Sequence, residues 1–194
     1  MAAAVEAILA GGVVLSPTDT AYMLATDGLN EAAVRRVIDI KRRSPEMAIA
    51  VIVPSLTAAA KYVGVTDAAR RLAERFLPGP LTLVLPKTDT VPDVLTGGRP
   101  TLGIRVPGHT FSLALAERAG RPITATSANV SGGDAAYTLT EALSQLPADA
   151  LDLAIDGGRV ATPGVSTIVD LSGEWPVILR EGLIPDSDIL EALS

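Results

Sequence analysis

Residues 13–20 read Val-Val-Leu-Ser-Pro-Thr-Asp-Thr, an apolar run that stops at a proline and a group of hydroxyl side chains. Such a run is typical of a buried strand that ends abruptly in a loop, and open α/β sheets place ligands in the loops at strand ends. Residues two apart in an extended segment project to the same side, so Thr18 and Thr20 are candidate ligand contacts while Asp19 points elsewhere. The alternative is a turn of threonine and aspartate that satisfies only its own backbone.

Outward from this stretch, apolar runs of strand length alternate with helix-favouring segments. The unbroken apolar character of the strands favours a mainly parallel or mixed sheet with helices on its faces. The sequence therefore predicts one α/β domain over residues 1–194, built on a twisted open sheet. Predicted helices cover 2–10, 31–42, a short segment after Ser55, 66–76, 110–119, 139–146 and the end from Ser187; predicted strands cover 13–15, 48–53, 81–85, 101–106, 123–126, 153–155, 167–169 and 177–179.

The segments between these elements contain turn and cap signals. Asn30, Ser55 and Thr66 are predicted to cap the helices that follow them. Residues 90–100 are rich in proline, glycine and aspartate, which predicts a surface excursion. Residues 21–29 are interpreted only as a loop with a short apolar patch.

The composition excludes several classes of function. The chain has no cysteine, which rules out disulfides, thiolate chemistry and cysteine-ligated metals, and its one histidine, His109, rules out a multi-histidine metal site. A net charge of -6 argues against a surface held to nucleic acid mainly by phosphate neutralisation. The first basic residue is Arg35 and no apolar run is long enough to span a membrane, so we expect a soluble cytoplasmic protein without a signal peptide.

Cations and hydrogen-bonding side chains follow several predicted strands, and no obvious general base accompanies them. Lys41 and Arg43 lie at the C-terminal end of the helix predicted over 31–42, and we expect this end of the helix to be exposed. This combination suits a polyanion, because fixed positive charges and hydroxyls hold phosphates without proton transfer by the protein. The candidates at strand ends are Thr18, Thr20, Arg105, Ser127, Asn129, Ser166 and Arg180.

Each candidate also has a structural explanation. The macrodipole favours cations at a helix C-terminus. Arg105 lies inside an apolar strand and must find an anionic partner or reach the edge of the sheet. Arg180 can extend along apolar surface at a strand end, and residues 127–129 can form a turn of the Asx type. His109 precedes a predicted helix and is assigned a structural or capping role.

Seven short segments, none of them specific alone, occur in a fixed order over nearly the whole chain: 16–22, 41–43 as Lys-x-Arg, 77–82, 101–107, 127–129 as Ser-x-Asn, 166–168 and 179–182. Together they resemble the motifs of the YrdC-type family, the threonylcarbamoyl-AMP synthases. The resemblance implies a twisted open α/β sheet with a concave, positively charged ligand cavity. It also implies an enzyme that joins L-threonine, bicarbonate and ATP into L-threonylcarbamoyl-AMP, with Mg²⁺ assisting and pyrophosphate leaving.

In this family a separate transferase then moves the threonylcarbamoyl group to the tRNA adenosine next to the anticodon. From the acidic charge and the lack of a long apolar run we expect neither an extended nucleic-acid surface nor a membrane partner, and no metal-ligating side chain is assigned. By position, Lys41 and Arg43 would be the catalytic pair. The threonine side would comprise Thr20, Arg105, the backbone around Ala125, and Ser166; the ATP side would comprise Lys41, Arg43, Thr101, Ser127, Asn129 and Arg180.

Two departures from the family pattern keep alternatives open. Met23 stands where the family usually has glycine, and a methionine there fills space or changes the local backbone. Ser44 separates Arg43 from Pro45, whereas the family tends to place proline directly after Lys-x-Arg. The alternatives are a divergent paralogue that forms a carbamoyl-adenylate of another amine, and a nucleotide- or RNA-binding module without turnover.

Overall fold

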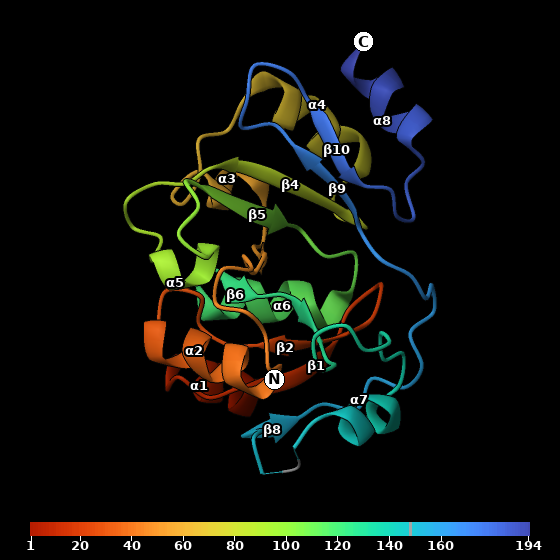
Figure 1. Ribbon diagram of the computed structural model, residues 1–194. Coiled ribbons are helices and arrows are strands. Elements are labelled where there is room, and N and C mark those ends of the chain that lie inside the picture. Colours follow the sequence, from red (N-terminus) through yellow and green to blue (C-terminus); the bar gives the residue numbers. More distant parts are fainter. Residues whose placement is uncertain (148) are drawn as a thin grey trace.

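The structure is a computed structural model that describes residues 1–147 and 149–194, in which helices cover two hydrogen-bonded sheets (Figure 1). The helices are α1 (Ala2–Leu9), α2 (Glu31–Ile40), α3 (Leu56–Ala59), α4 (Asp67–Phe76), α5 (Asp93–Thr96), α6 (Thr110–Ala119), α7 (Leu139–Gln145) and α8 (Asp186–Leu193). The strands are β1 (Val14–Pro17), β2 (Tyr22–Ala25), β3 (Val51–Ile52), β4 (Leu81–Pro86), β5 (Thr101–Arg105), β6 (Ile123–Thr124), β7 (Thr126–Ser127), β8 (Leu153–Ala154), β9 (Thr167–Asp170) and β10 (Val177–Arg180).

The strands form a smaller sheet in the order β7-β2-β1-β8 and a larger one in the order β10-β9-β4-β5-β3-β6. In the smaller sheet β1 is antiparallel to β2 and parallel to β8. In the larger sheet β4 is parallel to β9 and antiparallel to β5. The mixed α/β architecture predicted from the sequence is therefore confirmed, whereas the division of its strands between two sheets is not indicated by the sequence.

The chain crosses from the larger sheet to the smaller one at Ala125. Thr124, the last residue of β6, pairs with Val51, and Thr126, the first residue of β7, pairs with Leu24. The Ala125 amide donates to the carbonyl of Ala50 at 2.8 Å. The single strand predicted over 123–126 is thus two short strands in different sheets, because an apolar run indicates a strand but not its neighbours.

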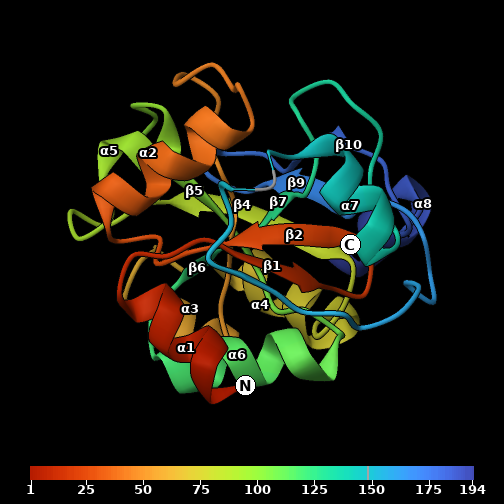
Figure 2. The same cartoon turned by 90° about the horizontal axis from the view of Figure 1, so that it is seen from below.

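Strands β1 and β2 are buried on both faces, which explains why residues 13–15, around the start of β1, read as an unbroken apolar run. Alternate side chains enter two different cores, as the period of two in a strand requires. Leu15, Tyr22 and Leu24 enter the larger core, and Val14, Met23 and Ala25 enter a second core that contains residues of α1 and α6. Figure 2 shows α1 and α6 side by side next to this sheet.

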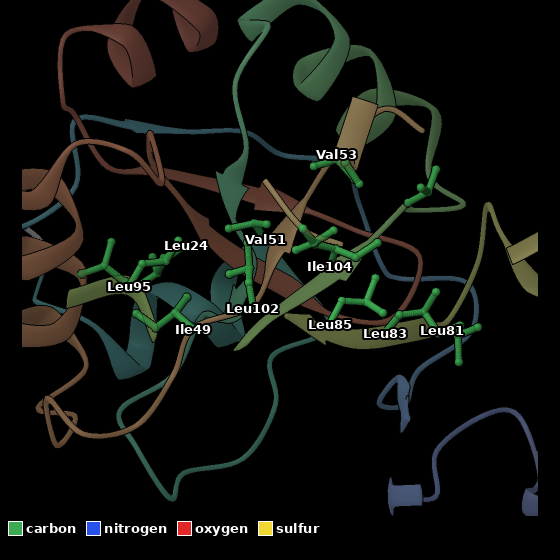
Figure 3. Packing of buried hydrophobic residues seen from close by; sticks show 14 of the residues in the cluster. Leu24, Ile49, Val51, Val53, Leu81, Leu83, Leu85, Leu95, Leu102 and Ile104 are labelled. Carbon is green, nitrogen blue, oxygen red and sulfur yellow. The ribbon is translucent and has the colours of Figure 1, made fainter. Parts of the chain in front are cut away.

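The larger core lies among β3, β4, β5 and the helices that cover them. Leu81, Leu83 and Leu85 of β4 belong to this core, which also contains Leu24 of β2, Val51 of β3, Leu102 and Ile104 of β5, and Leu95 of α5 (Figure 3). Leu95 is fully buried, so the prediction of a surface excursion over 90–100 holds only in part: Thr90, Asp93 and residues 98–100 are exposed, but the segment also contributes side chains to the core. Val91 and Leu95 lie four residues apart and both face the core, although the proline, glycine and aspartate around them indicated a loop.

Local side-chain chemistry sets where several helices begin. The side chains of Asn30, Ser55 and Thr66 each accept a hydrogen bond from the backbone amide three residues later, so their predicted capping roles are confirmed. No helix within 1–147 or 149–194 combines the length and apolarity needed to cross a membrane.

Candidate active site

A cavity of about 390 Å³ lies where the two sheets meet. Its lining comes from both sheets and from the loops after β1, α2 and β7. The lining is rich in hydroxyl groups and in arginine side chains, and no carboxylate or histidine contributes to it among the residues that the structure describes. The polar residues that line it are Thr18, Thr20, Tyr22, Arg43, Thr82, Arg105, Thr126, Ser127, Asn129, Ser166 and Arg180.

The loop after β1 supports both of its interpretations. The Thr18 hydroxyl donates to the carbonyl of Ala21 at 2.7 Å and accepts the amides of Thr20 and Ala21, so the turn satisfies its own backbone. Thr18 and Thr20 nevertheless both line the cavity, and their hydroxyl oxygens are 3.2 Å apart. The turn therefore fixes two hydroxyls in the cavity wall, directly after the end of β1.

Arg105 is held in place by three different groups. Its Nη2 lies 2.7 Å from an oxygen of Asp19, its Nη1 donates to the Thr20 hydroxyl at 2.9 Å, and its Nε donates to the carbonyl of Gly79 at 3.0 Å. Arg105 is only 8% exposed, so the expectation that it must find an anionic partner is confirmed. Arg105 also lines the cavity, so these three groups fix the position of its guanidinium in the wall.

Lys41 and Arg43 diverge because helix α2 ends in a Schellman motif. The amide of Arg43 donates to the carbonyl of Ile38 at 3.0 Å and the amide of Arg42 to that of Asp39 at 2.9 Å, with Arg42 at φ 48°. Arg43 then lines the cavity, and its guanidinium donates to the carbonyls of Met47 and Ala48. Lys41 is only 1% exposed, so the expectation that it lies at an exposed helix end is wrong.

The left-handed conformation of Arg42 leads to a stability prediction. A residue with a Cβ is strained there by about 1–2 kcal/mol, and glycine is not. We expect Arg42→Gly to raise the free energy of unfolding by about 0.5–1 kcal/mol, net of the chain entropy that glycine loses. Thermal unfolding of Arg42→Gly beside Arg42→Ala measures this, since the alanine variant keeps the strain. A Tm of Arg42→Gly at or below that of Arg42→Ala would contradict the prediction.

Ser127 and Asn129 lie in the loop that follows β7 and line the cavity. The Lys41 ammonium donates to the carbonyls of Ser127 and Asn129 and to the side-chain oxygen of Asn129. The Asn129 side-chain amide in turn donates to the carbonyl of Gly133 at 2.6 Å. Lys41 itself is not part of the lining and lies behind this loop.

Ser166 and Arg180 lie side by side in the cavity lining, Ser166 in the loop before β9 and Arg180 at the end of β10. The Arg180 guanidinium donates to the carbonyl of Ser166 at 2.8 and 3.0 Å and to its hydroxyl at 3.1 Å. The Ser166 hydroxyl also lies 2.9 Å from that of Thr82. Thr82 is a cavity residue that the sequence analysis missed, and the signal is a lone hydroxyl residue within the apolar strand β4.

The structure brings together most, but not all, of the candidate residues. Ala125 lines the cavity at the junction of the sheets. Thr101 does not line it, because Thr101 opens β5 opposite Pro86, about 13 Å along the strand from Arg105 at the usual rise per residue. His109 occupies the N-cap position of α6, but its side chain makes no capping hydrogen bond there, and burial lowers its pKa.

Burial disfavours the charged forms of the cavity cations Arg43 and Arg180, and of Lys41 behind the wall. Burial, followed by the charge of Arg43, lowers the pKa of Lys41 to about 8, so Lys41 keeps its proton at pH 7. Burial also lowers the pKa of Arg43 and of Arg180, and the charge of Arg105 adds to the effect on Arg180. Because like charges in a partly dry site repel one another, this arrangement favours a ligand with several negative charges.

The fold and site define an α/β protein with a cleft between two sheets, and a lining of arginines and hydroxyls is typical of sites for small anionic ligands. The family model described as Telomere recombination, which covers Sua5, YciO and YrdC, matches residues 6–182. The chain belongs to this family.

Several relatives are named threonylcarbamoyl-AMP synthase or putative threonylcarbamoyl-AMP synthase. The chain is 40% identical over 183 residues to the threonylcarbamoyl-AMP synthase of Pyrococcus abyssi, covering 92% of this chain and 53% of the relative. It is 35% identical over 178 residues to the putative threonylcarbamoyl-AMP synthase of Methanocaldococcus jannaschii, covering 92% of this chain and 83% of the relative. The chain thus spans about half the length of the Pyrococcus relative.

Solved structures give the same family and fold. The crystal structure of Pyrococcus abyssi Sua5 complexed with L-threonine superposes with a TM-score of 0.94 at 36% identity, covering 98% of this chain and 56% of that one. The crystal structure of Escherichia coli YciO superposes with a TM-score of 0.84 at 31% identity, covering 94% of this chain and 89% of that one.

Proposed function

We propose that this protein is a threonylcarbamoyl-AMP synthase, which joins L-threonine, bicarbonate and ATP and releases pyrophosphate. The observation that carries the proposal is the cavity lining, which combines Arg43, Arg105 and Arg180 with hydroxyl groups and has no carboxylate or histidine in the described chain. Such a lining suits a reaction among anions in which the protein positions substrates and balances charge. Relatives that bear this activity name, and a threonine complex of one of them, support it.

The proposal divides the cavity into two sides. On the threonine side, Arg105 receives the carboxylate, the hydroxyls of Thr20 and Ser166 bind polar atoms of the substrate, and the backbone at Ala125 closes the pocket. On the nucleotide side, Arg43, Arg180, Ser127 and Asn129 hold the phosphates, and Lys41 adds positive charge behind them. Thr101 takes no part, because it lies outside the cavity.

The chemistry consists of two bond-forming steps. The amine nitrogen of threonine bonds to the carbon of bicarbonate, and water leaves to give the carbamate. A carbamate oxygen then bonds to the α-phosphorus of ATP as the bond to pyrophosphate breaks. Both partners of the second step are anions, so Arg43 and Arg180 lower its barrier by offsetting their repulsion and the charge on the leaving group.

Magnesium enters this proposal only as a partner of ATP. Protein-bound Mg²⁺ usually uses one or two carboxylates together with phosphates and water. The cavity lining has no carboxylate, and the described residues contain no cluster of acidic residues and histidine that could hold a metal. A dedicated protein site for Mg²⁺ therefore does not fit, and the ion would be bound to the triphosphate.

The product is a mixed anhydride, so a transferase must consume it. We propose the tRNA threonylcarbamoyl transferase step, on the adenosine next to the anticodon, and a cytoplasmic location where ATP and tRNA are both present. This protein then needs no tRNA surface of its own, in keeping with its net charge of -6.

Incubation of the protein with ATP, bicarbonate, Mg²⁺ and a panel of amino acids tests the proposal, with acyl-adenylates detected by mass spectrometry and pyrophosphate measured in parallel. We expect threonylcarbamoyl-AMP and pyrophosphate in equal amounts, and neither without bicarbonate. Release of pyrophosphate only with another amine would indicate a divergent acceptor. Nucleotide binding without any pyrophosphate would rule out the proposed reaction.

Met23 offers a test of substrate selectivity. It is 2% exposed, packs in the second core and lines the cavity together with Ile52. We expect Met23→Ala to lower the free energy of unfolding by about 2–3 kcal/mol and to raise turnover of amino acids larger than threonine. Met23→Leu is the matched control, because a swap of similar volume costs less than about 1.5 kcal/mol. An unchanged amino-acid profile in Met23→Ala would remove Met23 from the pocket that determines selectivity.

A further inference from the structure

The ammonium group of Lys41 is fully occupied within the protein. An ammonium has three N–H donors and no acceptor. In Lys41 the three oxygens within hydrogen-bond distance are the carbonyls of Ser127 and Asn129, the latter at 2.7 Å, and the side-chain oxygen of Asn129 at 3.3 Å. In the described chain these oxygens account for every donor of Lys41, and none is left for a phosphate.

Lys41 also holds the same loop through its backbone. The carbonyl of Lys41 accepts the amide of Ser131 at 2.8 Å. The loop from Ser127 to Gly133, which we call the 127–133 loop, has no strand or helix beyond Ser127 and therefore depends on such contacts for its order. Its residues Ser127, Asn129 and Gly133 line the cavity.

Arg43 provides a direct comparison. Its guanidinium makes two hydrogen bonds, from Nε to the carbonyl of Met47 and from Nη2 to the carbonyl of Ala48. Three of its five N–H donors therefore remain, and Arg43 lines the cavity. The Schellman motif at the end of α2 produces this division, because it sends Lys41 behind the 127–133 loop and Arg43 into the cavity.

We infer that Lys41 is a positioning residue: its ammonium and its carbonyl fix the 127–133 loop, so that Ser127 and Asn129 face the nucleotide side, and Arg43 supplies the direct cationic contact to phosphate. The nucleotide as ligand rests on the proposed function. The order of the loop in the protein without ligand does not rest on it.

Hydrogen exchange of the ligand-free protein tests the inference independently of turnover. Lys41→Met removes the ammonium and keeps most of the aliphatic stem. We expect amides of the 127–133 loop to exchange about tenfold faster or more, because charge-assisted hydrogen bonds are lost from a loop with little other support. Arg43→Met and the exposed control Lys61→Met should leave exchange of this loop unchanged. Unchanged exchange in Lys41→Met, or equal acceleration in Arg43→Met, would overturn the inference.

The KM values for ATP and threonine distinguish loss of the loop's position from a general loss of stability, which would affect both. We expect Lys41→Met to raise the KM for ATP about tenfold while the KM for threonine stays within about twofold, since the loop contributes to the nucleotide side only. An equal rise in both constants would contradict the assignment. Absence of turnover in the wild-type protein would refute the proposed function, and the exchange experiment would still decide the role of Lys41.

A wild-type measurement covers the case in which Lys41→Met fails to fold. The chain has three lysines, at positions 41, 61 and 87, so the ammonium signals can be assigned by nuclear magnetic resonance. We expect the Lys41 ammonium to be protected from solvent exchange in the ligand-free protein and to stay protected when a Mg²⁺ complex of a non-hydrolysable ATP analogue is added. Loss of protection before or after this addition would show that Lys41 leaves the loop, and would overturn the inference.

Discussion

Arg105→Met is expected to weaken both the fold and threonine binding. In this variant the largely buried carboxylate of Asp19 loses the guanidinium that lies 2.7 Å from it. An unpaired charge in such a position lowers the free energy of unfolding by about 3–5 kcal/mol. This corresponds to a fall in Tm of about 10 °C for a domain of this size. If Arg105 receives the substrate carboxylate as proposed, its loss is expected to raise the KM for threonine about a hundredfold. Thermal unfolding and threonine saturation curves measure the two effects.

The double variant Asp19→Asn/Arg105→Met separates these effects. Removing the carboxylate charge relieves the unpaired group, so the double variant should regain part of the lost stability. It should not regain threonine binding, because the guanidinium is still absent. Recovery of threonine saturation together with stability would mean that Arg105 acts only through the fold.

Arg43→Met is expected to reduce kcat/KM for ATP about 10²–10³-fold, the effect typical of removing one group that stabilises transition-state charge. Its unfolding free energy should fall by about 1–3 kcal/mol, less than expected for Arg105→Met, because the hydrogen bonds of Arg43 within the described residues reach only the nearby carbonyls of Met47 and Ala48. Pyrophosphate release at varied ATP concentration measures the kinetic loss.

Arg42→Met is the matched control for Arg43→Met. Arg42 is the adjacent residue, carries the same charge, is exposed and does not line the cavity. Its replacement should leave kcat/KM for ATP within about twofold of the wild type, since exposed charges are screened by water and salt. Equal losses in the two variants would assign the effect to net charge rather than to contact with the phosphates.

Local patterns in the sequence predicted local structure well. The capping residues Asn30 and Thr66 begin α2 and α4 as expected, and the helix predicted over 110–119 has the bounds of α6. Spacing could not show which strands pair. Residues 22–25 were interpreted as an apolar patch in a loop, yet they form β2, because antiparallel pairing with β1 supplies the hydrogen bonds that a four-residue strand lacks alone.

The candidate site was predicted in its residue types more than in its contacts. The need of Arg105 for a partner follows from its apolar strand, but nothing in the sequence identified that partner as Asp19. Lys41 was expected at an exposed helix end, because the sequence shows where the helix stops and not the 127–133 loop that covers it. Thr82 was missed because a hydroxyl in an apolar strand has no distinct pattern without the sheet partners that bring it to Ser166.

Ala125 lines the cavity, and it is also the single residue that separates β6 from β7. Enlarging this side chain to reshape the pocket would also push against the point where one sheet continues into the other. A change at Ala125 that alters the range of substrates would therefore also affect how the two sheets are joined. Variants selected for a new acceptor at this position should need compensating changes in the sheets before they regain thermal stability.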